Sequence, residues 1–273
     1  MNCRQHISGF LIGLLSLSLV CVAQAGPRED GLKAYQQGHY ADAIKLWTPL
    51  AEAGDTEVQY NLGIMYSEGR GVDQDFKKAI NWLKAAAEKE DADAASRLGL
   101  LYILGKGVEK DYAQAEKWLR LAANKGNANG QYHLALMYAN GLGLNQDHML
   151  AMRWYYKAAQ QNHTGAQFNL GHMHEQGLGI PKDYNEAFRW YDKAAREGAA
   201  DAQANLGRMY FLGLGVPKDS VVAYAWFSTA AKQNLASAEA NKIFVFSRLN
   251  TKEKKDAEEL ARQYISKFAK ASS

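Results

Sequence analysis

Residues 58–87 read VQYNLGIMYSEGRGVDQDFKKAINWLKAAA, and the same pattern returns every 36 residues along most of the chain. The period is clearest at three framework positions, which hold tryptophan at 82, 118, 154, 190 and 226, leucine at 62, 98, 134, 170 and 206, and aspartate at 75, 111, 147, 183 and 219. A fixed period of about 20 to 50 residues is typical of a solenoid, in which each unit buries its apolar face only against its neighbours. The sequence therefore predicts a stack of similar units.

Each unit is predicted to contain two amphipathic helices. Apolar residues recur at i, i+4, i+7 and i+8 in the first half of a unit and at i, i+3, i+4, i+7 and i+8 in the second. In the first unit these positions are Val58, Leu62, Met65 and Tyr66, followed by Ala79, Trp82, Leu83, Ala86 and Ala87. Between the halves, a glycine suits the end of a helix and an aspartate suits the start of the next. Gln114 and Glu186, three residues after such aspartates, are expected to complete capping boxes.

Glycine recurs where packing or backbone conformation requires it. Four first helices hold a glycine near the middle (residues 63, 99, 171 and 207), although glycine there costs about 1 kcal/mol relative to alanine, which indicates close helix contact. Between units, glycine (126 and 198) alternates with asparagine (162 and 234), as expected for a left-handed backbone conformation. Glu90 departs from this rule, so we expect Glu90→Gly to stabilise the fold.

The composition excludes several classes of protein. The 273 residues are 47% hydrophobic and 22% charged, which is too apolar for a disordered chain. The formal net charge of only +3 predicts no nucleic-acid partner. Only four prolines, together with 24 glycines, suit an all-α protein whose turns use glycine.

Residues 1–25 are predicted to be a signal peptide rather than part of the fold. Arg4 precedes an apolar stretch from Ile7 to Val22, and Ala23 and Ala25 match the small residues of a signal peptidase site. The stretch is shorter than the ~20 residues of a membrane span, so we expect cleavage after Ala25 and no membrane span afterwards. The only two cysteines lie in this segment. The mature protein is expected to be periplasmic or secreted, and cleavage lowers its net charge from +3 to +2 because Arg4 is lost.

The repeated residues resemble the Sel1-like repeat, a relative of the tetratricopeptide repeat. Its pattern of Leu-Gly, Tyr, Gly-x-Gly, Asp, Trp and Ala-Ala covers five units over residues 58–238. Residues 26–57 are similar to a further unit with a shortened, tetratricopeptide-like loop, and residues 239–273 are expected to form C-terminal capping helices. The resemblance implies an all-α, right-handed α-solenoid of about six helix-turn-helix repeats with a C-terminal capping helix. It also implies that the first helices line a concave face.

No catalytic, cofactor-binding or metal-binding constellation stands out in the sequence. G-x-S-x-G and H-E-x-x-H motifs are absent, and the mature chain has no cysteine nucleophile. His172 and His174 lie about 200° apart on a helix, so they are poorly placed to share a metal ion. The tryptophan and tyrosine columns follow the apolar stripe of each unit, which favours a core role over a ligand-stacking ladder.

Positions that vary between units are the candidate binding residues. By analogy with the tetratricopeptide repeat, the positions that face the concave groove hold Tyr132, Phe168, His172, Glu175, Arg208 and Phe211. Aromatic side chains beside single charges suit a protein or peptide partner of unknown identity, although a merely solvated groove is the alternative.

The sequence favours an exported, non-catalytic interaction scaffold or adaptor. One alternative is peptidoglycan- or β-lactam-directed binding or hydrolysis, because some cysteine-rich secreted relatives are described in this way. This chain departs from that branch, since its mature part has neither a cysteine nor a Ser-x-x-Lys motif. A second alternative is a secreted factor that contacts a host.

Overall fold

The computed structural model describes residues 26–269, in which all regular secondary structure is α-helical. The helices are α1 (Pro27–Gln36), α2 (Tyr40–Glu52), α3 (Thr56–Glu68), α4 (Phe76–Ala87), α5 (Ala92–Leu104), α6 (Tyr112–Asn124), α7 (Ala128–Asn140), α8 (His148–Gln160), α9 (Thr164–Gln176), α10 (Tyr184–Arg196), α11 (Ala200–Leu212), α12 (Ser220–Ala231), α13 (Ala236–Ser247) and α14 (Thr251–Phe268). The predicted signal peptide, residues 1–25, lies outside the described residues. Within them, no helix has the length and apolar character of a membrane span.

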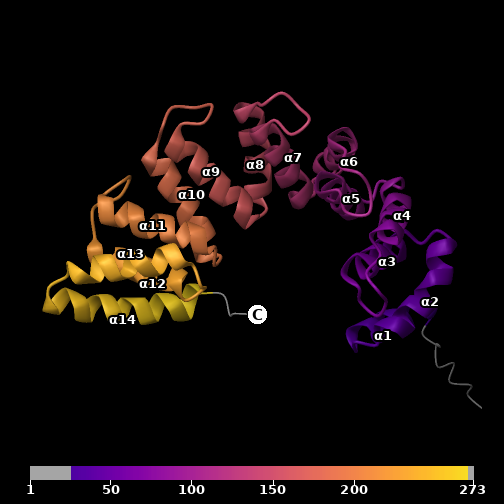
Figure 1. Ribbon diagram of the computed structural model, residues 1–273, viewed down its shortest axis with the longest axis horizontal. Helices are drawn as coiled ribbons and strands as arrows, with labels where there is room; N and C mark the ends of the chain where they lie inside the picture. The colour runs from indigo at the N-terminus through magenta and orange to yellow at the C-terminus, as the bar shows by residue number, and fades with distance from the viewer. Residues whose placement is uncertain (1–25, 270–273) are drawn as a thin grey trace, which may run out of the picture.

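The helices form an open arch of stacked hairpins. Figure 1 shows the chain rising from α1, passing over a crown at α7 to α9, and descending to α14. The first helices of the regular units are α3, α5, α7, α9 and α11, and the second helices are α4, α6, α8, α10 and α12. The α-solenoid and its helix-turn-helix units are therefore as predicted. The hairpin of α1 and α2 has a loop of only residues 37–39, whereas the next hairpin has one at residues 69–75.

The Gly-x-Gly loop of each unit packs closely against the preceding unit. The first glycine ends a first helix in the left-handed conformation, as at Gly69 with φ of 70°. The second glycine leaves no room for a side chain, because a Cβ on Gly107 would lie 2.5 Å from the Cβ of Phe76 in the preceding unit. A positive φ and a close approach therefore both require glycine at this position.

Aspartates cap the second helices, but without capping boxes. The side chain of Asp111 accepts a hydrogen bond from the backbone N–H of Gln114 at 2.9 Å, as predicted. The backbone N–H of Asp111, however, donates to the carbonyl of Tyr102, and Asp183 makes the same bond to His174. Because this N–H is already used, the expected return bonds from the side chains of Gln114 and Glu186 do not form. The capping-box prediction was therefore wrong at both positions.

The framework columns form the core. Four of the five periodic tryptophans are buried and Trp82 is half-buried, while the leucine column is buried throughout. A Cβ on Gly63 would lie 2.6 Å from Cγ of Leu83, which confirms the predicted close approach of the two helices in a unit. Glu90 has φ of 64°, in line with the glycines and asparagines at its position in other units.

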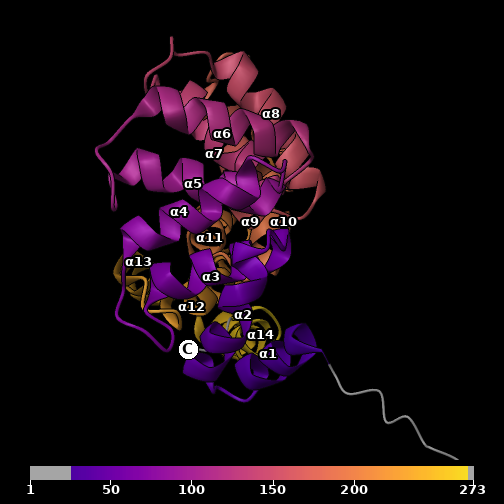
Figure 2. The same ribbon diagram turned by 90° about the vertical axis from the view of Figure 1, so that its right-hand side faces the viewer.

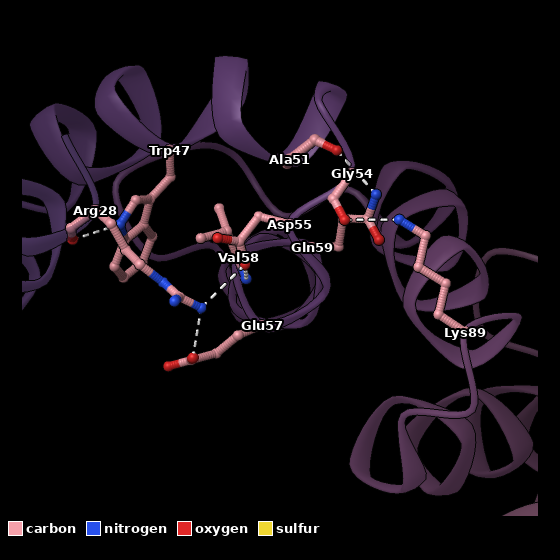
Figure 3. Close-up of polar contacts among 9 residues, drawn as sticks. All are labelled: Arg28, Trp47, Ala51, Gly54, Asp55, Glu57, Val58, Gln59 and Lys89. Atoms are coloured by element: carbon pink, nitrogen blue, oxygen red, sulfur yellow. Dashed lines mark hydrogen bonds and ion pairs between the residues drawn. The ribbon is translucent and has the colours of Figure 1, made fainter. Parts of the chain in front are cut away.

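Buried glutamines join successive units through hydrogen bonds. The side-chain amides of Gln59, Gln131, Gln167 and Gln203 donate to the carbonyls of Ala51, Ala123, Ala159 and Ala195. These carbonyls lie at the C-terminal end of a second helix, and each also accepts a backbone N–H from three residues later, as Ala51 does from Gly54. Figure 3 shows the first joint, in which Gln59 binds Ala51 at 2.8 Å and Lys89 reaches the carbonyl of Gly54 at 2.6 Å.

The C-terminal end is closed by α13 and α14, which both pack on α12. Helix α12 contains no charged residue, because it is enclosed by α11, α13 and α14. The ring of Phe268 stacks on Trp226 at 5.3 Å, and Tyr264 meets the same indole edge-on at 4.7 Å. The apolar stripe of the predicted cap therefore packs on the last tryptophan of the repeat array.

Candidate functional site

The first helices line the concave face of the arch. Helices α5 and α7 pack against each other directly, and no two successive second helices of the regular units pack as closely. A hollow of about 280 Å³ on this face is lined only by side chains of α3, α5 and α7. We call it the polar hollow; its residues are Tyr60, Asp93, Ser96, Arg97, Leu100, Asn129 and His133.

The polar hollow contains an arginine that is held in place and a neutral histidine. Arg97 pairs with Glu68 at 2.8 Å, which fixes the guanidinium beside the hollow. Burial, together with the neighbouring His163 and Arg97, lowers the pKa of His133 to about 4. Burial also raises the pKa of Tyr60. At neutral pH the hollow therefore offers an uncharged imidazole and phenol beside an ion pair.

Tyr132 belongs to an aromatic cluster next to the hollow. Its ring stacks on His163 at 4.3 Å with an interplanar angle of 25°, and it lies 5.1 Å from the ring of His133. His163 also caps α9 through Nδ1 and contacts the side chain of Asn129 at 3.2 Å through Nε2. Tyr132 is half-buried, so one part of its ring packs within the protein and the other remains accessible.

Glu175 is buried rather than exposed in the groove. Its carboxylate accepts a hydrogen bond of 2.9 Å from the hydroxyl of Tyr191 and forms an ion pair with Arg208. Burial and the nearby carboxylate raise the pKa of Tyr191, so the phenol remains a donor. The ring of Phe168 lies against Tyr191 at 5.6 Å. Phe168, Glu175 and Arg208 are thus brought together around Tyr191, and Glu175 holds Arg208 rather than facing a partner.

The remaining two predicted residues flank this cluster, because His172 lies one turn from Phe168 and Glu175 on α9 and Phe211 lies one turn after Arg208 on α11. His172 is exposed and lines a second hollow of about 370 Å³ with Asn169 and Leu136. Phe211 is half-buried because Phe244 of α13 meets it edge-on at 5.7 Å. Five of the six predicted residues therefore lie on the adjacent first helices α9 and α11, and Tyr132 lies on α7.

A polar column lies on the same face and is not among the predicted binding residues. The residue immediately before each framework leucine is Asn61, Arg97, His133, Asn169 and Asn205 in successive units. Two of these, Arg97 and His133, line the polar hollow, and Asn169 lines the second one. The sequence itself could have indicated this column, because its position is polar in all five units. Core positions are apolar, and the variable positions mix polar and apolar residues.

The chemistry of the site suits binding. Among residues 26–269, no three His, Cys, Asp or Glu side chains are grouped as a metal site. His172 is exposed, whereas the Nδ1 atom of His174 is buried, so the two histidines face different surroundings. The ion pairs of Arg97 and Arg208 join neighbouring units, and their exposed edges leave guanidinium N–H groups at the surface.

The repeat geometry agrees with comparisons to known proteins. The Sel1 repeat family model matches residues 56–91, 92–127, 128–163, 164–198 and 200–235. The chain belongs to the Sel1 repeat family. A Sel1 repeat protein from Oxalobacter formigenes is 32% identical, covers 86% of this chain and 98% of its own, and superposes with a TM-score of 0.76. None of the curated protein sequences matches this Sel1 repeat chain.

A second solved structure is a protective antigen present in uropathogenic Escherichia coli strains, which displays the same repeat fold. It is 31% identical with a TM-score of 0.59 and covers 90% of this chain, which spans 64% of the antigen. The matched repeats begin at residue 56, where α3 starts, two residues before the expected start of the repeat array.

Proposed function

We propose that this Sel1 repeat protein is an exported, non-catalytic scaffold that binds a protein partner along its concave face. The observation that carries this proposal is the column two residues after each framework leucine, which holds Ile64, Leu100, Leu136, His172 and Arg208. The framework around this column is constant, yet its chemistry changes from apolar in the first three units to polar in the last two. Such a change along one face provides a directional surface for an extended partner segment.

The polar groups of this face support a binding role rather than catalysis. Arg97 and Arg208 each form an ion pair with a glutamate of the preceding first helix. His133 is uncharged at neutral pH, because burial lowers its pKa to about 4. These groups are held in fixed positions by neighbouring units, which limits the side-chain entropy lost when a partner binds.

The proposal is tested by affinity capture from an envelope extract with two triple variants, one on the concave face and one on the outer face. The concave variant carries Arg97→Gln, Asn129→Ala and His172→Ala, which change accessible side chains and leave the buried Glu175 and Tyr191 in place. The control carries Lys77→Gln, Asn81→Ala and Lys84→Gln on the exposed face of α4. We expect a partner that is retained by the parent and the control and lost by the concave variant.

The captured partner is then purified and titrated against all three proteins. A dissociation constant at least tenfold weaker for the concave variant alone supports the proposal. Equal binding by all three proteins contradicts it. Circular-dichroism melts establish that the variants are folded, so that a loss of binding is not a loss of structure.

Export is tested separately by localisation. Export is supported by Arg4, the apolar stretch that follows it and the Ala23-Gln24-Ala25 sequence. We expect the protein in an osmotic-shock fraction, with Gly26 as its first residue. A protein that retains Met1 and stays with the cytoplasm contradicts export.

A secreted or surface-exposed factor is the second candidate, because one relative of 31% identity is a protective antigen of uropathogenic strains. Recovery of the mature protein from culture medium rather than from the osmotic-shock fraction favours this candidate over the periplasmic one. The concave-face variants distinguish partner binding in either location.

A further inference from the structure

The two layers of the arch differ in charge. Helices α4, α6, α8 and α10 contain ten lysines and arginines and three acidic residues, whereas α3, α5, α7, α9 and α11 contain two basic and five acidic residues. Each of the three acidic residues in the second helices forms an ion pair within its own helix: Glu116 with Arg120, Glu186 with Arg189, and Asp192 with Arg196. Lys78 and Lys84 of α4 also pair with acidic residues next to their helix, so the unpaired excess of positive charge lies mainly on α6, α8 and α10.

Helix α8 has the most distinctive outer face. It contains no acidic residue, and its exposed stripe consists of Met149, Arg153, Tyr156 and Lys157. Met149 is 52% exposed and Tyr156 48%, which is high for large apolar or aromatic side chains. Among residues 26–269, neither Arg153 nor Lys157 has an acidic partner within 4.0 Å.

The position of α8 makes this stripe accessible to a large surface. Helix α8 lies at the crown of the arch in Figure 1 and remains near the top in the perpendicular view of Figure 2. Its buried face, with Trp154 and Ala158, packs into the core, so the stripe points away from the concave side. A flat object can therefore touch α8 while the concave face stays open to a partner.

Neighbouring helices extend the same chemistry to both sides of α8. Lys117 of α6 and Lys193 of α10 are also exposed and form no ion pair in the described part of the chain. Lys157 lies 4.2 Å from the ring centroid of Trp154, and Lys117 and Lys193 lie 4.6 and 4.3 Å from the ring centroids of the tryptophans in their own helices. Tyr156 meets Trp190 of the next unit edge-on at 5.8 Å. Cations and amphipathic rings thus alternate across three successive units.

We propose that this crown, defined by Lys117, Met149, Arg153, Tyr156, Lys157 and Lys193, docks on an anionic membrane surface. Unpaired lysines and arginines are attracted to anionic headgroups, and tyrosine and methionine beside them are suited to the interface between headgroups and acyl chains. The exposed apolar side chains favour a lipid surface over a soluble polyanion, which offers only charge. Docking at the crown goes beyond partner binding, since it holds the concave face away from the membrane.

The proposal is tested by sedimentation of the purified protein with vesicles. The vesicles contain phosphatidylcholine alone or phosphatidylcholine with 30% phosphatidylglycerol. We expect binding only to the anionic vesicles and its loss in 0.5 M salt. The double substitution Arg153→Gln and Lys157→Gln is expected to weaken partitioning about 25-fold, since each cation near an anionic surface contributes about fivefold.

Two controls make the result decisive. Lys252→Gln and Lys255→Gln on α14 remove the same charge from exposed sites away from the crown and are expected to leave binding unchanged. Met149→Ser with Tyr156→Ser keeps every charge and is expected to weaken binding as well, which a purely ionic contact does not predict. Four results would each overturn the proposal. The α14 control could lose binding to the same extent, or the protein could bind neutral vesicles equally well. It could also bind no vesicles, or bind soluble polyphosphate but no vesicles.

Discussion

Glu90 is the one non-glycine, non-asparagine residue at a left-handed position in the described chain. Its φ is 64°, beside 60° at Asn162 and 89° at Gly126, and its carboxylate pairs with Lys125 on the protein surface. Surface ion pairs contribute little to stability, whereas a side chain with a Cβ at positive φ is strained. We therefore expect Glu90→Gly to raise the melting temperature measured by circular dichroism.

Two further substitutions separate the two effects at this position. Glu90→Ala removes the ion pair and keeps the strain, so it is expected to lower the melting temperature slightly. Glu90→Asn removes the ion pair and suits the conformation, so it is expected to lie between alanine and glycine. A melting temperature for Glu90→Gly at or below that of Glu90→Ala contradicts the strain argument.

His133 makes stability depend on pH. Burial lowers its pKa to about 4 from an ordinary value of 6.5, so the folded protein favours the neutral imidazole. Between these values the unfolded chain binds more protons than the folded one, and stability is lost as the pH falls from about 6.5 towards 4. Denaturant unfolding at pH 7.5 and 4.5 is expected to show a smaller loss of unfolding free energy for His133→Gln than for the parent. An identical pH dependence in both proteins would show that other groups dominate.

Residue identity alone predicts the framework better than the binding face. The tryptophan, leucine and glycine columns repeat because every unit packs against its neighbours in the same way. The framework residues of one unit therefore predict those of the next. Glu175 occupies a position that varies between units, and such variation predicts exposure. Its burial depends on Tyr191 and Arg208 of the neighbouring elements, and no periodic pattern records such a unit-specific pairing.

The ends of the helices are also only partly predictable from the sequence. The aspartate caps were predictable from local spacing, but the missing capping boxes depend on the carbonyl of Tyr102 or His174, which lies nine residues earlier and is brought into reach only by the hairpin. The two-residue difference at the start of the repeat array has the same origin, because Asp55 caps α3 and starts it at Thr56. Local pattern therefore predicts which elements exist, and contacts between elements set their boundaries.

The joint between the third and fourth regular units lacks a side-chain hydrogen bond that the preceding joint makes. In the preceding joint, the side chain of Gln161 donates to the side-chain oxygen of Gln131 and to the carbonyl of Gly126, both at 2.9 Å. The equivalent residue of the later unit is Glu197, which has no side-chain donor when ionised. Accordingly, the buried side-chain oxygen of Gln167 has no hydrogen-bond partner among residues 26–269.

Glu197→Gln is expected to supply the missing donor and raise the unfolding free energy by about 1 kcal/mol, the usual net gain for such a bond. The measurement is chemical denaturation of a double-mutant cycle with Gln167→Met, which removes the acceptor while keeping the volume similar. We expect the gain from Glu197→Gln to vanish in the Gln167→Met background. A gain that persists there would come from the loss of negative charge and not from the new bond.

At the scale of the whole molecule, α14 sets where the solenoid stops. In earlier units the outer face of the second helix carries charged side chains such as Lys157 and Lys193, and α12 instead has Thr229 at this position, fully buried. In other units the side-chain amide of the equivalent glutamine donates only to the preceding unit. The amide of Gln203 also donates to the carbonyl of Phe268 at 2.9 Å. Helix α14 therefore covers the apolar surface of α12 and also accepts a hydrogen bond from the last glutamine of the repeat array. A further repeat unit would otherwise fill this place.

Deleting residues 251–273 is expected to uncover Trp226 and Thr229 and to weaken the end of the array before its middle. Because each unit contacts mainly its neighbours, hydrogen exchange should increase in α11 to α13 while α3 to α8 keep their protection. The exposed apolar face should also cause self-association at micromolar concentration. Deleting only residues 270–273 is the control and keeps Phe268. A uniform loss of protection from α2 to α13 would mean that the arch unfolds as one cooperative body, in which the cap stabilises every unit equally.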